Sequence, residues 1–344
     1  MTANSSPRVH KSSRTLIVAP SWIGDTILAQ PLLSRLAAQG AIIDVLAPGW
    51  SAPLLQRMPE VNRVIKSPFG HGDFAFSKRR ELGRKLAAER YDAAYVLPNS
   101  WKSALVPFFA GIPLRIGYQG EARYGLLNRR HRLDKNALPQ LAQRYARLAD
   151  PTDTTTVPEL PAVRLTSGTE QQHSARSAMG LALDGAPVIF CPGAEYGPAK
   201  RWPAHHFATL AQKLGSTSDP VWILGSAADV AVGEAIVNAA KGCAVNLCGR
   251  TSLEQAVDLI ATARLVVSND SGLMHVAAAL DRPLLALYGS SSPVYTPPLS
   301  SHAKIVSMNV ECSPCFKREC PLGHFKCMEE MVPEIVLNLT RPSN

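Results

Sequence analysis

The sequence predicts an α/β protein with two Rossmann-like domains, and three observations support this fold class. Short apolar segments of strand-like composition alternate with longer segments that have helical spacing. This alternation occurs twice, and residues 150–161, which are rich in proline and threonine, separate the two series. Such alternation favours parallel sheets covered by helices, so the loops after the strands of both domains are expected to face one cleft.

The first predicted domain spans residues 14–160 and follows a polar tail, residues 1–13, that we expect to be flexible. Its strands are short apolar runs, which suit a sheet buried on both faces. Its helices place apolar residues three and four apart. The strands are expected at 15–19, 42–46, 63–65, 94–97 and 115–118, and the helices at 26–39, 52–57, 78–90 and 101–110.

The second predicted domain, residues 161–330, repeats the pattern without an obvious internal sequence repeat. The same two criteria, apolar runs and helical spacing, define its elements. The strands are expected at 188–191, 221–224, 244–247, 265–268 and 284–288, and the helices at 204–214, 230–240, 253–262 and 272–280.

The composition favours a soluble globular protein. Of the 344 residues, 46% are hydrophobic and 18% are charged, which is typical of a chain that buries a core. No apolar run approaches the ~20 residues that a membrane-spanning helix needs. Because the N-terminus also has no apolar signal segment, we expect a cytoplasmic protein that touches a membrane surface.

Positive charge is concentrated in the first 150 residues. They hold 22 Lys and Arg against 10 Asp and Glu, whereas the remainder holds 14 against 17. The imbalance predicts an acidic partner for the first domain, and a solvated basic face is the alternative. No common nucleic-acid-binding signature accompanies the charge, so no nucleic-acid partner is expected. The candidate anion-facing runs are Lys78-Arg79-Arg80, Arg84-Lys85 and Arg129-Arg130-His131-Arg132.

A carboxylate stands where α/β proteins often bind phosphate. The first strand leads through a turn that ends at Gly24, and Asp25 then opens a predicted helix. The free N–H groups and the dipole of a helix start favour an anion, and here the chain supplies its own. Because a positioned carboxylate can act as a general base, Asp25 is a candidate to accept a proton from a substrate hydroxyl.

Two junctions in the second domain suit a phosphorylated ligand. Lys200 and Arg201 come just before Pro203, which suits the first turn of a helix, so two cations would stand beside a helix start. The next junction reads NDSGLMH, residues 269–275, between a predicted strand and a predicted helix. A surface loop with incidental charge, helix caps and a structural histidine are the alternative interpretations of these residues.

A weaker candidate is Asp229, which follows Gly225 at the end of a predicted strand and suits either a ribose hydroxyl or a helix cap. The motifs G-x-G-x-x-G and G-x-x-x-x-G-K-[ST] are absent, which argues against dinucleotide oxidoreductases and P-loop kinases. Together the candidates predict a transferase that holds a nucleotide-activated donor in its second domain.

Six segments between residues 19 and 293 carry a family resemblance. They read APSWIGDTILAQPLL, AIIDVLAPGW, YVLPNSWKSALVPFFAGIPLRIGY, YGLLN, CPGAEYGPAKRWP and NDSGLMHVAAALDRPLLALYGSSSP. Together they resemble glycosyltransferase family 9, the ADP-heptose:lipopolysaccharide heptosyltransferases. The resemblance implies a GT-B fold, in which two facing Rossmann-like domains with parallel sheets enclose an interdomain cleft. It also implies that residues 331–344 form a C-terminal helix that crosses back to the first domain.

The form GAEYGPAKRWP is typical of the type II enzymes of this family. The resemblance therefore implies inverting transfer of L-glycero-D-manno-heptose from ADP-heptose onto the first heptose of heptosyl-Kdo₂-lipid A, at the inner leaflet of the inner membrane, with no metal required. A family 9 enzyme with another acceptor (type I or III) is the main alternative. A nucleotide-sugar epimerase and a basic nucleic-acid-binding protein are the alternatives from other classes.

The resemblance also implies roles for single residues. Asp25 would be the catalytic base, and Lys200 would contact the donor diphosphate. The other donor-binding residues would be Glu195, Tyr196, Asp229, Asp270, Ser271, Gly272 and His275. We place the acceptor side at Gly24, Lys78, Arg79, Arg80 and Arg123. The role of Glu195 is left open, because type I enzymes carry hydroxyl residues where this chain has Glu195-Tyr196.

Four cysteines lie close together in the C-terminal sequence, namely Cys312, Cys315, Cys320 and Cys327. A C-x₂-C pair followed by two further cysteines could ligate zinc or an iron–sulfur cluster, with His324 as a spare ligand. Reduced thiols in a compact loop are the alternative, because disulfides are rare in cytoplasmic proteins. Zinc at this segment would be structural and not required for transfer.

Overall fold

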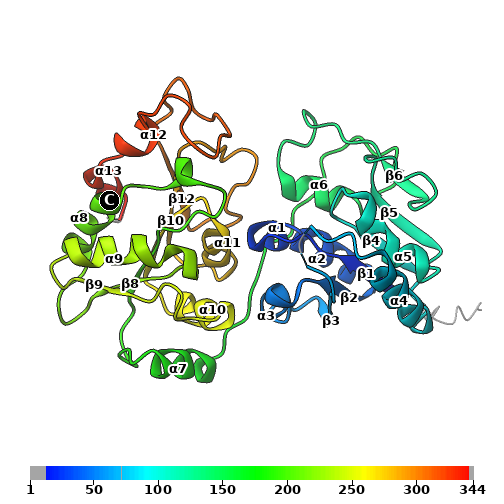
Figure 1. The fold of residues 1–344 in the computed structure, drawn as a ribbon, viewed down its shortest axis with the longest axis horizontal. Coiled ribbons are helices and arrows are strands. Elements are labelled where there is room, and N and C mark those ends of the chain that lie inside the picture. Colours follow the sequence, from blue (N-terminus) through cyan, green and yellow to red (C-terminus); the bar gives the residue numbers. More distant parts are fainter. Residues whose placement is uncertain (1–12, 71, 341–344) are drawn as a thin grey trace, which may run out of the picture.

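The computed structural model describes residues 13–70 and 72–340, and Figure 1 shows them as two α/β domains side by side. Except for Ser13, the predicted tail over residues 1–13 lies outside the described residues. Each domain contains one six-stranded sheet in which all neighbouring strands are parallel. These two sheets confirm the predicted fold class. No helix in the described part of the chain is long and apolar enough to cross a membrane.

The first sheet has the strand order β3-β2-β1-β4-β5-β6. Its strands are β1 (Arg14–Val18), β2 (Ile42–Ala47), β3 (Val61–Lys66), β4 (Ala93–Val96), β5 (Leu114–Tyr118) and β6 (Arg129–His131). The chain moves outward from β1 to β3 and then returns to the other side of β1. The strand order therefore reverses between β1 and β4, which is where open α/β sheets bind ligands, and the loop after β1 leads to Asp25.

Helices cover both faces of the first sheet. Ile17 and Val45 pack on the side of α1, α2, α3 and α6, whereas Leu16 and Val96 pack on the side of α4 and α5. The helices are α1 (Ile23–Leu28), α2 (Gln30–Ala38), α3 (Ala52–Leu55), α4 (Phe76–Leu86), α5 (Leu105–Phe109) and α6 (Leu141–Arg147). Burial on both faces explains why the central strands β1 and β4 are largely apolar.

The second sheet has the order β12-β11-β10-β7-β8-β9. Its strands are β7 (Val188–Cys191), β8 (Val221–Ile223), β9 (Ala244–Asn246), β10 (Leu265–Asn269), β11 (Leu284–Tyr288) and β12 (Ala303–Ser307). Its helices are α7 (Thr169–Ala178), α8 (Ala204–Leu214), α9 (Val230–Ala239), α10 (Leu253–Ala261), α11 (Gly272–Ala279), α12 (Lys326–Glu329) and α13 (Pro333–Leu339). Here the order reverses between β7 and β10, so the loops that carry Lys200 and Asp270 meet at one place.

The terminal helix does not cross to the first domain. In the described residues α13 packs against α8, and Val336 is buried in the same core as Trp202 and Phe207. The indole N–H of Trp202 also donates to the Met331 carbonyl at 2.6 Å. The prediction of a crossing helix is wrong, because the apolar face of α13 completes the core of the second domain.

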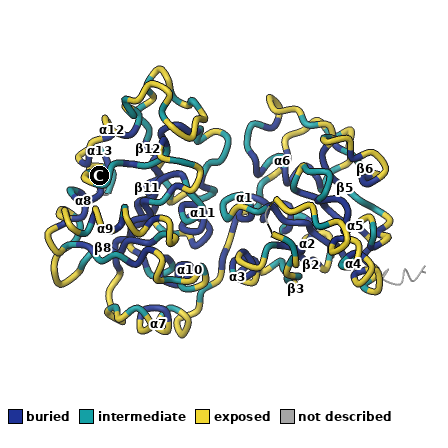
Figure 2. Tube along the Cα trace, in the orientation of Figure 1, coloured by how far each residue is buried: buried dark blue, intermediate teal, exposed yellow. Residues whose placement is uncertain are grey.

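The two domains meet through the N-terminal turns of α1 and α11. A Cβ added at Gly24 would lie 2.7 Å from Cδ2 of His275, and one added at Gly272 would lie 2.8 Å from Cβ of Ile23. The two glycines therefore permit a close approach that a side chain would block. The first turns of α1 and α11 are intermediate in burial, and α1 is mostly teal in Figure 2.

Polar contacts reinforce the junction beneath α1. Arg57 and Asp258 form a buried ion pair at 2.8 Å between the domains. The Gln30 side chain donates to the backbone carbonyl of Arg164 at 2.7 Å and accepts from its N–H at 2.8 Å. The chain that joins the two sheets is thus held against the first domain.

Several predicted elements differ from the observed ones. The single helix expected over residues 26–39 is two helices, α1 and α2, because Pro31 near the start of α2 has no N–H to continue the ladder. The strands β6 and β12 and the helices α6 and α7 were not predicted. The two strands lie at the ends of their sheets and are partly exposed, so they lack the apolar run that marks a buried strand.

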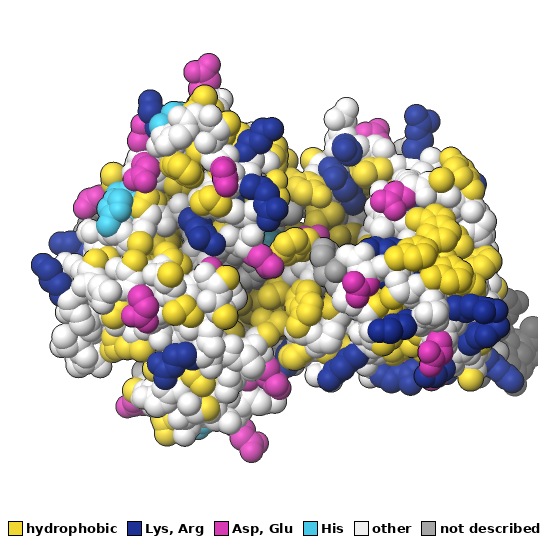
Figure 3. Space-filling model, viewed as in Figure 1, with side chains coloured by type: hydrophobic (Ala, Val, Ile, Leu, Met, Phe, Trp, Pro, Cys, Tyr) yellow, Lys and Arg dark blue, Asp and Glu magenta, His cyan; other side chains and the backbone are white. Residues whose placement is uncertain are grey.

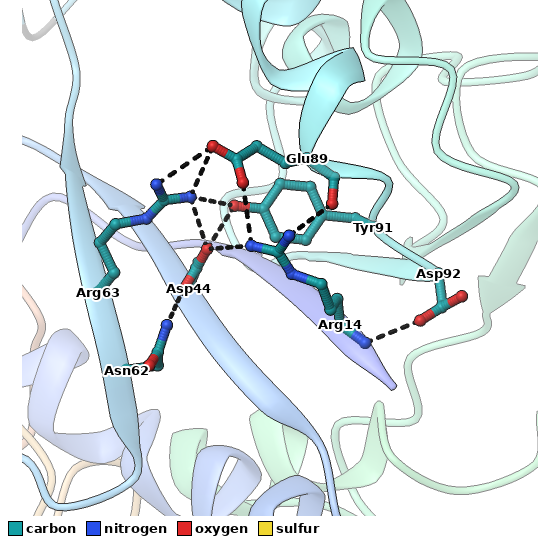
Figure 4. Close-up of polar contacts among 7 residues, drawn as sticks. All are labelled: Arg14, Asp44, Asn62, Arg63, Glu89, Tyr91 and Asp92. Carbon is teal, nitrogen blue, oxygen red and sulfur yellow. Dashed lines mark hydrogen bonds and ion pairs between the residues drawn. The ribbon is translucent and has the colours of Figure 1, made fainter. Parts of the chain in front are cut away.

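A polar network lies on the α4 side of the first sheet (Figure 4). Its centre is the buried carboxylate of Asp44 on β2. The donors around it are Tyr91 Oη at 2.6 Å, Asn62 Nδ2 at 2.8 Å, Arg63 Nη2 at 2.8 Å and Arg14 Nη2 at 3.5 Å. Glu89 pairs with both arginines, at 3.0 and 3.2 Å. The network ties β1, β2 and β3 to the segment before β4.

Candidate active site

A cavity of about 800 Å³ lies between the domains and is lined by the loops at the carboxyl ends of both sheets. The surface is hollowed between the two domains in the space-filling view (Figure 3). Nine of the predicted site residues line the cavity: Gly24, Asp25, Glu195, Tyr196, Lys200, Asp270, Ser271, Gly272 and His275. Residues predicted from separate motifs are therefore brought together in one place.

Asp25 lies in the first turn of α1 on the wall of the cavity. Burial raises the pKa of Asp25 from 3.8 to about 6; the nearby Lys200 lowers it in part, and Asp270 raises it further. A carboxylate with this pKa is ionised at neutral pH and is a stronger base than an ordinary aspartate. This combination suits a group that must accept a proton.

Lys200 faces Asp25 from the second domain. Its ammonium nitrogen lies 2.5 Å from Oδ2 of Asp270 and 5.3 Å from the centre of the Tyr196 ring. Asp270 follows β10, so the ion pair holds the lysine at the carboxyl end of the sheet. The amine is thereby oriented toward the cavity that it lines.

The loop that carries Lys200 is held by Asn269. The backbone N–H of Trp202 donates to Oδ1 of Asn269 at 3.1 Å, and Nδ2 of Asn269 donates to the carbonyl of Pro192 at 2.7 Å. Both ends of the loop are thus fixed to the last residue of β10. A cationic loop fixed in this way is preorganised for an anion.

His275 lies on α11 and packs its ring against Gly24. Burial lowers the pKa of His275 to about 4, and Lys200 lowers it further against the effect of Asp270. The ring is therefore neutral at neutral pH. Its Nδ1 is buried and has no hydrogen-bond partner among the described residues.

Asp229 does not line the cavity. Its carboxylate accepts hydrogen bonds from the backbone N–H and the hydroxyl of Ser226, at 2.9 and 2.8 Å. Gly193 and Gly225 pack directly against its side chain. Asp229 is therefore a buried cap of its own turn, and its contact with the donor stays a prediction.

The four cationic residues expected on the acceptor side do not line the cavity either. The Arg79 guanidinium is buried and donates to the backbone carbonyls of Asp73, Phe74 and Lys102. The remaining three are Lys78 and Arg80, which are exposed on α4, and Arg123, which is buried with the backbone carbonyls of Pro98 and Tyr118 as acceptors. Charge runs alone do not distinguish a buried guanidinium that holds loops from an exposed one.

The third candidate anion-facing run is also partly structural. Arg129, Arg130 and His131 form β6, and His131 is buried. Burial lowers the pKa of His131 to about 4, so it adds no positive charge at neutral pH. Only part of this run can face an anionic partner.

Sequence reasoning missed several residues of the cavity. The first domain adds Trp22, Trp50 and Leu141, and the second adds Ser291, Ser292, Tyr295, Thr296 and Phe316. The backbone carbonyl of Tyr295 accepts the N–H of Leu141 at 2.9 Å, which joins the domains at the cavity wall. The segment after β11 could have been found, because it follows a strand end like the other site loops.

The cysteine segment is packed against the loop that carries Lys200. The Phe316 carbonyl accepts the Tyr196 hydroxyl at 3.0 Å, and the Arg318 guanidinium donates to the Tyr196 carbonyl at 2.6 Å. Phe316 therefore reaches the cavity although it lies far from the other site residues in the sequence. No sequence pattern predicts this contact.

The four cysteines line one small cavity together with Ser290 and His324. All four are free thiols. Burial and the other three thiols raise the pKa of Cys327 to about 11, whereas a backbone N–H of Phe325 lowers that of Cys320. In the described residues no three of the thiol sulfurs lie within 4.8 Å of one another; His205, His206 and Glu329 are the group that does. The thiols converge but do not form a closed tetrahedral set.

Comparison with known proteins agrees with this arrangement. Residues 79–326 match glycosyltransferase family 9 (heptosyltransferase). Lipopolysaccharide heptosyltransferase 2 of Escherichia coli (strain K12) is 47% identical over 335 residues, which cover 94% of this chain and 96% of that protein. Lipooligosaccharide heptosyltransferase 2 of Haemophilus influenzae is 45% identical over 338 residues and covers the same shares.

Solved structures give the same result. The structure of E. coli ADP-heptose lps heptosyltransferase II matches with a TM-score of 0.84 at 43% identity, covering 94% of this chain and 96% of that one. A glycosyltransferase family 9 protein from Veillonella parvula matches with a TM-score of 0.81 at 22% identity over 95% of both chains, which supports the fold alone. These matches confirm the GT-B fold and the predicted resemblance. The chain belongs to glycosyltransferase family 9, the heptosyltransferase family.

Proposed function

We propose that the chain is an inverting glycosyltransferase that moves L-glycero-D-manno-heptose from ADP-heptose onto the first heptose of the lipopolysaccharide inner core. The observation that carries the proposal is that one cavity joins Asp25 of the first domain to Lys200 and Asp270 of the second. A base opposite an anion-binding group is what displacement of a diphosphate requires. The names of the relatives, heptosyltransferase 2 and ADP-heptose lps heptosyltransferase II, support this donor and this acceptor.

In the proposed reaction, the acceptor hydroxyl attacks the anomeric carbon of the donor heptose. Its proton passes to the Asp25 carboxylate as the new C–O bond forms. The bond from the anomeric carbon to the diphosphate breaks, and ADP leaves with the electron pair. Configuration inverts because the hydroxyl and its base stand on the face opposite the leaving group.

Lys200 is assigned to the diphosphate of the donor. The ion pair with Asp270 keeps the ammonium group at the cavity wall before the donor binds. As ADP leaves, negative charge grows on its terminal phosphate, and a fixed ammonium stabilises that charge more in the transition state than in the ground state. We propose that no metal cofactor is needed, and activity that persists in excess chelator would support this.

The acceptor can be tested directly. ADP release from ADP-heptose should require heptosyl-Kdo₂-lipid A and should not occur with Kdo₂-lipid A. Release with Kdo₂-lipid A alone would instead assign the chain to the type I reaction. Free heptose without any acceptor would indicate an epimerase or a hydrolase. Donor binding without release on either acceptor would overturn the proposed transfer.

Structural zinc at the four cysteines is a separate proposal. Their C-x₂-C spacing and their convergence on one cavity support it, although binding would have to draw the thiolates closer together. Protein purified without chelator should carry bound zinc that Cys315→Ser removes. Metal-free protein with normal folding and activity would leave the segment as a loop of reduced thiols.

We also propose that the protein works at the inner leaflet of the inner membrane. The acceptor is a lipid, and the described residues include no helix that could anchor the chain by crossing the membrane. We propose that side chains on the protein surface make the contact with the membrane.

A further inference from the structure

A cluster of aromatic rings lies on the first domain outside the cavity. Phe74 and Phe76 come from the loop before α4 and from its first residue, and Trp101, Phe108 and Phe109 come from the 3₁₀ turn before α5 and from α5. The rings contact one another in a chain, with centroids 5.5 to 6.0 Å apart. Phe74, Phe76 and Phe108 are 54%, 43% and 42% exposed. Exposed aromatic rings gathered in one place are typical of an interaction site.

The cluster is preformed by the packing beneath it. The buried Arg79 guanidinium donates to the carbonyls of Phe74 and Lys102, at 2.7 and 3.2 Å, and so joins the loop before α4 to the turn before α5. A Cβ at Gly83 would lie 2.5 Å from Cβ of Phe109, so α4 and α5 are in direct contact. The rings are therefore held outward by a fixed scaffold.

Cations predominate on α4, which carries Phe76, and the carboxylates of Asp73 and Glu121 lie beside Phe74 and Trp101. Lys78, Arg80, Arg84 and Lys85 are exposed on α4, where the single acidic residue, Glu81, pairs with Lys85 at 2.7 Å. Figure 3 shows hydrophobic side chains gathered on this domain, with Lys and Arg side chains beside them. We call these five rings and four cations the α4–α5 surface.

We propose that the α4–α5 surface docks the protein on an anionic phospholipid bilayer. Aromatic rings settle at the level of the headgroups, and lysine and arginine attract anionic lipids, so this combination fits a membrane interface. The inference rests on the proposed function in one respect: a lipid acceptor gives the protein a reason to bind a membrane. Because α4 and α5 belong to the domain that carries Asp25, on the other face of its sheet from α1, docking would hold that domain at the membrane that contains the acceptor.

The test is sedimentation of the full-length protein with vesicles of phosphatidylcholine, with or without phosphatidylglycerol. We expect wild type to bind the anionic vesicles only. The triple variant Phe74→Ala/Phe76→Ala/Phe108→Ala should bind about tenfold more weakly or worse, because three partly exposed rings no longer enter the interface. The variant Lys78→Gln/Arg80→Gln/Arg84→Gln should also weaken binding, and added salt should weaken binding by wild type.

Matched variants on the second domain serve as controls. Leu183→Ala/Val230→Ala removes exposed apolar side chains, and Lys213→Gln/Lys241→Gln/Arg250→Gln removes exposed cations. Both should bind vesicles like wild type. Thermal unfolding of each variant separates a lost surface from a lost fold, and the charge variant alters only exposed side chains.

Two results would overturn the proposal. One is wild type that does not bind anionic vesicles, and the other is binding that neither variant of the α4–α5 surface weakens. If the phenylalanine variant instead abolishes self-association and leaves vesicle binding unchanged, the occupant is a second copy of the chain. Transfer to a deacylated, water-soluble acceptor should survive in the phenylalanine variant, so failure of docking is distinguishable from failure of the proposed function.

Discussion

Asp25 and Asp44 are two carboxylates of one domain whose pKa values move in opposite directions. Burial alone would raise the pKa of Asp44, but hydrogen bonds from Tyr91, Asn62 and Arg63 outweigh it and lower the value. At Asp25 burial dominates and raises the pKa to about 6, with only partial relief from Lys200. Asp44 is surrounded by hydrogen-bond donors that stabilise its charged form and the fold. Asp25 has few such donors, which preserves the basicity that proton transfer needs.

The largest expected effect is on turnover, from Asp25→Asn. This variant keeps the shape of the side chain and removes the base, so kcat should fall by about 10²–10⁴-fold. The free energy of unfolding should not decrease, because a charge that the fold disfavours has been removed. ADP release and urea unfolding on the same preparations measure both quantities. A variant that is unstable but turns over normally would make Asp25 a structural residue like Asp44.

Lys200→Met comes next. Loss of a preorganised charge beside the leaving group should lower kcat by about 10²–10³-fold. Because Lys200 lowers the pKa of Asp25, its removal should also shift the acidic limb of the pH–rate profile upward. Lys213→Met, an exposed change on α8, is the control. A lower kcat with an unmoved acidic limb would mean that the two groups do not interact as the structure indicates.

Asp44→Asn is expected to act on stability instead. It removes the buried anion from Arg14 and Arg63, which keep Glu89 and are themselves partly exposed, so the loss of charged hydrogen bonds should cost about 1.5–3 kcal/mol. Turnover per folded molecule should stay at the wild-type value. Asp92→Asn removes an exposed carboxylate that accepts the Arg14 N–H at 2.8 Å, and it should cost under about 1 kcal/mol. Equal costs for the two variants would show that burial of Asp44 is unimportant.

The contributions of Asp25 and Asp44 to stability should depend on pH in opposite directions. With the pKa of Asp25 near 6, kcat/KM should fall about tenfold per pH unit below that value. The raised pKa of Asp25 means that its contribution to stability decreases as pH rises from 3.8 toward 6. The lowered pKa of Asp44 gives stability that is present above 3.8 and is lost as pH falls below it. The free energy of unfolding of each Asn variant, compared with wild type, should therefore change in opposite directions as pH rises. The difference should increase for Asp25→Asn and decrease for Asp44→Asn.

The sequence was sufficient for the alternation of elements and for the loops at the strand ends. Buried parallel strands are continuous apolar runs, and the rule that ligands bind at their carboxyl ends placed Asp25, Lys200 and Asp270 near one cleft. The end strands β6 and β12 were missed because partial exposure removes that apolar signal. The crossing helix was wrong because the side on which α13 packs depends on the core it completes.

Site residues that depend on long-range packing could not be predicted. Phe316 enters the cavity only because the cysteine segment folds back onto Tyr196. Arg79 and Arg123 read as surface cations in the sequence but are buried against backbone carbonyls. Asp229 follows a strand end as a ligand contact would, yet it caps its own turn. In each case the same sequence pattern fits a ligand contact and a structural side chain. Which of the two roles the residue has depends on where distant backbone segments lie.

The smallest expected effect comes from Gly24→Ala, which tests whether the contact between the domains positions Asp25. The added Cβ would lie 2.7 Å from Cδ2 of His275, so the ring or α1 must shift. The backbone of Gly24 is not in the left-handed region, so the cost is steric alone. We expect kcat to fall by about tenfold, with a change in unfolding free energy below about 1 kcal/mol.

Gly49→Ala is the matched control, because the nearest atom to its Cβ is Lys66 Cδ at 4.0 Å, and it should leave kcat unchanged. If the effect at Gly24 comes from the ring, Gly24→Ala should lower kcat less in a His275→Ala background than in wild type, so the two changes will not be additive. Strict additivity would mean that Gly24 acts on Asp25 through the chain of α1 and not through the other domain. In that case the close approach of α1 and α11 would serve the stability of the junction, as the Asp44 network serves the sheet, and would not help to position the base.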